Sequence, residues 1–160
     1  MKIYLVEAGH ATPSLAWNAW SADDGRFAAP SAGLVSLASL VRKHDQVEII
    51  DEKVDGPVET LDADLVGISF KTMYAARAYE LADSLRKQGT KVVLGGLHAS
   101  LCPDEAAEHA DIVVVGEAES VWPQLLDDVE NGTEQPLYKA STPPPIDSLP
   151  CQRVELLNHK

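Results

Sequence analysis

Five short apolar runs, separated by segments with helical periodicity, are the feature that most constrains the fold of this 160-residue chain. Most of the runs are apolar on both faces, which is typical of parallel strands covered by helices on both sides. The runs cover residues 3–6, 47–50, 65–68, 92–94 and 112–115. This alternation predicts an α/β fold, a doubly wound five-stranded parallel sheet with helices on both faces.

Apolar side chains spaced at three and four residues mark the helices between these runs. Residues 34–41 and 74–85 carry such stripes and are expected to be crossover helices. Pro103 opens a short helix before the last strand, and a final stripe over 122–129 ends at Gly132. The order of strands and helices is that of a flavodoxin-like or Rossmann-like domain.

The length and composition indicate one domain. A chain of 160 residues with 45% hydrophobic content supports a single sizeable core. The periodicity stops from Thr133 onward, and the prolines at 143–145 are typical of a stiff, extended segment. We therefore expect a domain over 1–138 followed by a proline-rich linker over 139–160.

The composition excludes several classes of partner. The net charge of −12 leaves no phosphate-neutralising surface, so we expect no nucleic acid partner. No signal peptide or membrane-spanning apolar stretch is apparent, which predicts a cytoplasmic protein without a membrane partner. Cys102 and Cys151 lie far apart, and no histidine has a second ligand at metal spacing, so we expect neither a disulfide framework nor a zinc site.

Small and polar residues follow four of the strands, at the edge where doubly wound sheets bind ligands. They are Gly9 and His10 after the first strand, Ser69 and Thr72 after the third, Gly95, Gly96 and His98 after the fourth, and Gly116 and Glu117 after the fifth. The paired glycines leave room for something bulky close to the backbone. We take all of these residues as candidates for ligand binding.

Each candidate also has a purely structural interpretation. Gly95 and Gly96 could simply end a strand at a tight turn. The Thr72 hydroxyl could cap the following helix, and His98 could be a polar surface residue. Glu117 could only favour the dipole of the helix that follows it.

The same loops can be compared with what other functions of such a sheet edge would require. A dinucleotide would need GxGxxG after the first strand, where only Gly9 is present. A phosphorylated receiver domain would need an aspartate where Ser69 stands. A flavodoxin-like electron carrier stays open, because Thr12 and Ser14 offer hydroxyls to the phosphate of FMN. A protein-interaction domain with an empty crevice is a further alternative.

Taken in order, five segments resemble the cobalamin-binding domain at the N-terminus of cobalamin-dependent radical SAM enzymes. They are Pro30-Ser31-Ala32-Gly33-Leu34, Val47-Glu48-Ile49-Ile50-Asp51, Asp64-Leu65-Val66-Gly67-Ile68-Ser69, Gly95-Gly96-Leu97-His98-Ala99 and Asp111-Ile112-Val113-Val114-Val115-Gly116-Glu117-Ala118-Glu119. The resemblance covers residues 30–138 and implies that cobalamin lies over the sheet edge, with its dimethylbenzimidazole tail between the first and third strands.

The resemblance assigns roles to several of the candidates. Ser69 and Thr72 would hydrogen-bond the polar tail, and the glycines at 95 and 96 would leave room for it. Glu117 would accept a hydrogen bond from the ribose or from a corrin amide. The chain lacks the Asp-x-His-x-x-Gly motif of methionine synthase-type domains, so His10 is a candidate lower ligand of cobalt and equally a surface residue.

The catalytic machinery of such enzymes is absent from this sequence. Radical SAM chemistry needs a CxxxCxxC motif to hold a 4Fe–4S cluster and SAM, and the two cysteines here are isolated. We therefore expect a binding module that is not itself an enzyme. Through the linker it would present the corrinoid to a radical SAM barrel in cis, for methyl transfer or radical rearrangement.

Overall fold

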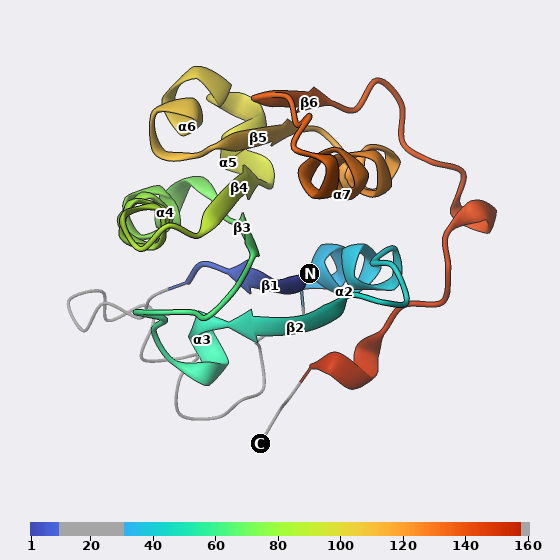
Figure 1. Cartoon of the computed structure of the whole chain (residues 1–160), viewed down its shortest axis with the longest axis horizontal. Helices are drawn as coiled ribbons and strands as arrows, with labels where there is room; N and C mark the ends of the chain where they lie inside the picture. The colour runs from blue at the N-terminus through green and yellow to red at the C-terminus, as the bar shows by residue number, and fades with distance from the viewer. Residues whose placement is uncertain (10–30, 158–160) are drawn as a thin grey trace.

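The computed structural model describes residues 1–9 and 31–157, and in them six parallel strands form one sheet in the order β2-β1-β3-β4-β5-β6 (Figure 1). The strands are β1 (Lys2–Glu7), β2 (Gln46–Asp51), β3 (Leu65–Ser69), β4 (Lys91–Gly95), β5 (Ile112–Val115) and β6 (Leu137–Lys139). All five predicted strands are present, and the predicted doubly wound α/β fold is confirmed.

Helices cover both faces of this sheet (Figure 1). They are α2 (Ala32–Ser39), α3 (Glu52–Asp55), α4 (Ala75–Lys87), α5 (Leu97–Leu101), α6 (Pro103–His109) and α7 (Trp122–Asn131), with short 3₁₀ turns η1 (Thr72–Tyr74), η2 (Ala118–Ser120), η3 (Ile146–Ser148) and η4 (Val154–Leu156). The predicted crossover helices and the short helix opened by Pro103 are all confirmed. Gly132 ends α7 in the left-handed conformation, with a φ of 67°.

The alternation of side chains along the strands builds a separate apolar core on each face. On one face Val66 of β3 packs with Leu81 of α4. On the other, Leu5 of β1 packs with Leu34 of α2 and Leu125 of α7. The two cores explain why the strands read as nearly continuous apolar runs, because each strand has to fill both layers.

The sixth strand was not predicted. β6 has three residues, of which the middle one, Tyr138, is buried between two exposed neighbours. So short an edge strand carries too little periodicity to be separated from a loop. Its Tyr138 pairs with Val114 of β5 and donates a hydrogen bond of 2.7 Å from its hydroxyl to Asp128 of α7. The predicted domain boundary at residue 138 therefore falls inside this strand.

The segment after β6 returns to the domain and contacts it. It passes along the side of α2 (Figure 1), where the Arg153 N–H donates to the carbonyl of Val35 at 3.4 Å. Leu156 and Leu157, both half-buried, pack against the apolar core of the α2 face. Residues 150–157 are thus docked on the domain, and the proline-rich stretch before them is largely exposed. Among the described residues, no helix has the length and apolarity needed to cross a membrane.

Candidate functional site

A crevice opens at the point where the strand order reverses. The chain passes from β1 to β2 on one side and then back to β3 on the other, which is where ligands bind in doubly wound sheets. The crevice holds about 610 Å³, including its open mouth, and lies between the sheet, α2 and the segment that leads into α7. Its lining consists of Leu5, Gly67, Ile68, Ser69, Val93, Gly95, Gly96, Val114 and Gly116 from the sheet edge and floor, Gly33, Leu34 and Leu37 from α2, and Glu117, Ala118, Glu119 and Trp122.

Gly67 shapes the floor of this crevice. It lies opposite Leu5 in β1 and Val93 in β4, in the middle of β3. A Cβ atom on Gly67 would be 3.1 Å from the Leu5 side chain and 3.4 Å from the six-membered ring of Trp122. The glycine therefore lets the large indole pack against the sheet, and the resulting floor is almost entirely apolar.

Gly95 ends β4 and Gly96 follows it, and the two positions lack a side chain for different physical reasons. Gly96 has a φ of 89°, and a Cβ atom there would lie 2.9 Å from the Phe70 nitrogen and 3.0 Å from the Ser69 hydroxyl. The tight turn alone requires this glycine. At Gly95 a Cβ atom would meet only Val114, at 3.8 Å, which is ordinary contact. Protein packing does not require a glycine at 95, where a side chain would enter the crevice.

The rim of the crevice carries the polar candidates. Ser69 lies opposite Gly95 in the register of β3 and β4. Gly116, with a φ of 86°, donates its N–H to the Ser100 hydroxyl at 3.0 Å. Glu117 is the residue before η2, and its exposed side chain makes no capping hydrogen bond. The structure therefore brings Ser69, Gly95, Gly96, Gly116 and Glu117 together around one opening.

Thr72 and His98 lie together, but outside the lining of the crevice. His98 is 7% exposed, and its ring lies 5.6 Å from that of Phe70 in the core of the opposite face. Its Nδ1 is 3.2 Å from the Thr72 hydroxyl oxygen. The interpretation of His98 as a surface residue is thus wrong. Thr72 lies inside η1, whose capping position is Lys71, so its hydroxyl serves His98 instead of capping the helix.

Gly9 lies two residues after the end of β1 and is not part of the crevice lining. Its N–H donates to the carboxylate of Glu52 at 3.3 Å. His10, the candidate cobalt ligand, and the hydroxyls of Thr12 and Ser14 lie outside the described residues.

Buried charge fixes the ends of the first two strands. Glu52 is 4% exposed and accepts hydrogen bonds from Arg77 at 2.7 Å and from the Val58 N–H at 2.9 Å. The hydrogen bond to Glu52 raises the pKa of Arg77. Glu7, 6% exposed, accepts from the Ser31 hydroxyl at 3.1 Å, at the start of α2. This contact ties one wall of the crevice to β1.

Sequence reasoning missed the residues that make the crevice apolar. Gly67 was assigned only to a strand and Trp122 only to a helix stripe. A glycine inside a β-branched strand is itself a sign of close approach, and it was the available signal. The Trp122 indole N–H is buried without a hydrogen-bond partner among the described residues, which the sequence could not show.

Comparison with known proteins identifies the family. The B12 binding domain matches residues 26–126. The chain is 46% identical over 114 residues to a bacteriochlorophyllide d C-8(2)-methyltransferase of Chlorobaculum tepidum, covering 71% of this chain and 25% of that protein. It is 34% identical over 129 residues to a bacteriochlorophyllide d C-12(1)-methyltransferase of the same organism, covering 79% and 28%. It is 31% identical over 118 residues to an uncharacterized methyltransferase of Pyrococcus horikoshii, covering 66% and 26%.

These matches concern one part of longer proteins. The chain spans about a quarter of the length of the curated relatives that it matches. No solved structure matches it significantly. The matched segment contains α2, strands β2, β3, β4 and β5, and the start of α7. It therefore contains every element that lines the crevice except β1. The resemblance drawn from the loop motifs is confirmed: the chain belongs to the B12 binding domain family.

Proposed function

We propose that this chain holds cobalamin with its nucleotide tail in the crevice between α2 and α7, and presents it to a radical SAM barrel in the same protein. The main support is Gly95. This residue lines the crevice, and the packing of the protein itself does not require a glycine there. Family membership supplies the identity of the ligand. The barrel would hold SAM and a 4Fe–4S cluster, and this chain alone would not catalyse a reaction.

The residues of the crevice fit such a tail. A flat heterocyclic base needs apolar walls, which Leu5, Leu34 and Trp122 provide. The ribose and phosphate next to the base need polar partners, and Ser69 and Glu117 stand at the rim. The buried N–H of Trp122 is a further donor without a partner among the described residues.

The comparisons support a division of roles within the whole protein. A bound corrinoid supplies a methyl group or a nucleophile at cobalt, and the residues of this chain bind and orient it. The two Chlorobaculum relatives are named for methylation at different positions, yet both match most of this chain. We therefore infer that the acceptor carbon is selected outside this chain. Family membership also favours cobalamin over the FMN and empty-crevice alternatives.

Retention of hydroxocobalamin by the purified chain tests the proposal. We expect the corrin absorbance to elute with the protein on gel filtration at one equivalent. Cofactor that always elutes separately would overturn the proposal. Added FMN, run in parallel, should elute separately.

A variant locates the cofactor. Gly95→Leu should fill the crevice and abolish retention, while circular dichroism shows an intact fold. Ala107→Leu is the matched control, because it adds the same side chain at an exposed position of α6. Unchanged retention by Gly95→Leu would place cobalamin elsewhere on the chain.

A further inference from the structure

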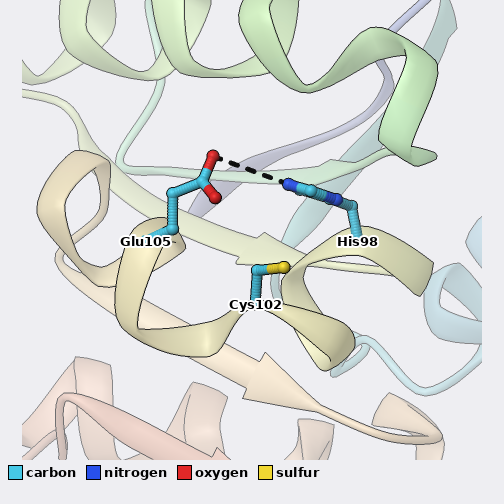
Figure 2. Close-up of side chains that lie close together, drawn as sticks. All are labelled: His98, Cys102 and Glu105. Atoms are coloured by element: carbon cyan, nitrogen blue, oxygen red, sulfur yellow. Dashed lines mark ion pairs between the residues drawn. The ribbon is translucent and has the colours of Figure 1, made fainter.

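Three metal-ligating side chains lie together on α5 and α6, outside the crevice (Figure 2). His98 belongs to α5, Cys102 joins the two helices, and Glu105 belongs to α6. One ligand atom from each lies within 4.8 Å of the others, and His98 Nε2 is 3.7 Å from Glu105 Oε1. Two ligand atoms bound to one tetrahedral zinc ion are about 3.4 Å apart, so the cluster needs only a small adjustment to close around an ion.

The imidazole of His98 gives independent evidence for a ligand. The side chain is 8% exposed, and Nε2 is buried with no hydrogen-bond partner among the described residues. Figure 2 shows the ring edge directed toward Glu105, with the Cys102 sulfur beside it. A buried ring nitrogen without a partner is costly, and such groups usually face a water or an ion.

The opposite nitrogen of the same ring is already held. Nδ1 lies 3.2 Å from the hydroxyl oxygen of Thr72. If Nε2 binds a metal, Nδ1 carries the proton and donates it to this oxygen. Histidine ligands of metals are typically oriented in this way by a second hydrogen bond.

We propose that His98, Cys102 and Glu105 form a site for a divalent transition metal, best matched by Zn²⁺. Nitrogen, thiolate and carboxylate ligands suit zinc, whereas Ca²⁺ and Mg²⁺ prefer oxygen alone. Three protein ligands leave the fourth tetrahedral position for water or an added ligand. The Glu105 side chain is 53% exposed, so an ion can enter from solvent.

The sequence expectation of no zinc site is thus revised by this geometry. The ligands follow the spacing His-x₃-Cys-x₂-Glu, which would lie along one face of a continuous helix. Here Cys102 leaves the helical conformation, with φ −128° and ψ 61°, and α6 begins anew at Pro103. The turn folds Glu105 back over His98. The site is independent of the cobalamin crevice, because its three ligands are not part of the crevice lining.

Metal titration of the untagged full chain, after removal of metals with a chelator, tests the proposal. We expect one equivalent of Co²⁺ to bind and to give the charge-transfer absorption of a cobalt–thiolate bond, and Zn²⁺ to displace it. Cys102→Ser should remove this absorption. Glu105→Gln should weaken Zn²⁺ binding more than about 100-fold, since losing an outer hydrogen bond already costs about 10- to 100-fold.

Matched variants separate this cluster from other ligands. Cys151→Ser changes the exposed second cysteine, and Glu108→Gln changes an exposed glutamate on α6. Both should bind metal like the parent chain. Thr72→Val should weaken binding by about 10- to 100-fold while the absorption persists. The proposal is overturned if the parent chain takes up no stoichiometric metal, or if the absorption survives Cys102→Ser or disappears in Cys151→Ser. Far-ultraviolet circular dichroism of each variant checks the fold.

Discussion

A Cβ atom on Gly96 would lie 2.9 Å from the backbone nitrogen of Phe70, so β4 turns into α5 only because this position has no side chain. The same turn brings the Phe70 carbonyl within 3.3 Å of the His98 N–H, which donates to it. The glycine therefore fixes the junction between the crevice and the cluster of His98, Cys102 and Glu105.

Gly96→Ala should destabilise the protein. The positive φ and the contact with Phe70 together are expected to lower the free energy of unfolding by about 1–3 kcal/mol. Urea unfolding followed by circular dichroism measures the change. Gly95→Ala is the control and should change it by less than about 1 kcal/mol, because its Cβ meets only Val114 at ordinary contact distance. Equal losses in the two variants would contradict the separation of roles.

Arg77→Met should strongly destabilise the domain. It leaves the carboxylate of Glu52, whose side chain is fully buried, without its cation. Breaking a buried ion pair from one side typically costs about 3–5 kcal/mol. Glu80→Gln removes the exposed partner of the same arginine and should cost less than about 1 kcal/mol. Similar denaturant midpoints for the two variants would show that Glu52 is not held by this pair.

Alkaline pH should weaken the attachment of β6. Burial and the hydrogen bond to Asp128 raise the pKa of Tyr138. A raised pKa of a phenol means that its contribution is complete below the unfolded value of about 10 and is lost as pH rises through the higher folded value. At neutral pH Tyr138→Phe should cost about 1 kcal/mol, and the difference from the parent chain should shrink above about pH 10.

Denaturant unfolding of both chains across this range measures that difference. Asp128→Asn, which keeps the shape of the partner and removes its charge, should lower the folded pKa of Tyr138, so that the loss is complete at lower pH. A difference that stays constant from neutral to alkaline pH would contradict the assignment.

Periodicity predicted those parts of the fold that bury long apolar stripes. Strands β1 to β5 and helices α2, α4 and α7 all do so, and the predicted bounds of each agree with the structure to within a few residues. β6 was not predicted, because Tyr138 is its only buried residue. The docking of residues 150–157 was not predicted, because it depends on tertiary packing of two leucines against the core of the α2 face.

The candidate site was predictable at its rim but not at its floor. Ser69 and Gly95 end their strands and Glu117 comes soon after β5, so the edge rule of parallel sheets placed them together. Trp122 enters the crevice because α7 returns over β3, which depends on the tertiary fold. The cluster around His98 depends on the break between α5 and α6 at Cys102, and no periodic pattern in the sequence predicts this break.

Leu157→Ala should lower the stability of the full chain, because this half-buried side chain packs on the core of the α2 face. Partial burial of a leucine is worth about 1–2 kcal/mol, less than the 1.5–3 kcal/mol of a fully buried one. Val154→Ala is the matched control, since Val154 is 60% exposed and its truncation should change little. Urea unfolding compares them, and equal midpoints would mean that the segment is a free linker. Hydroxocobalamin retention should be the same in both variants, because neither side chain lines the crevice.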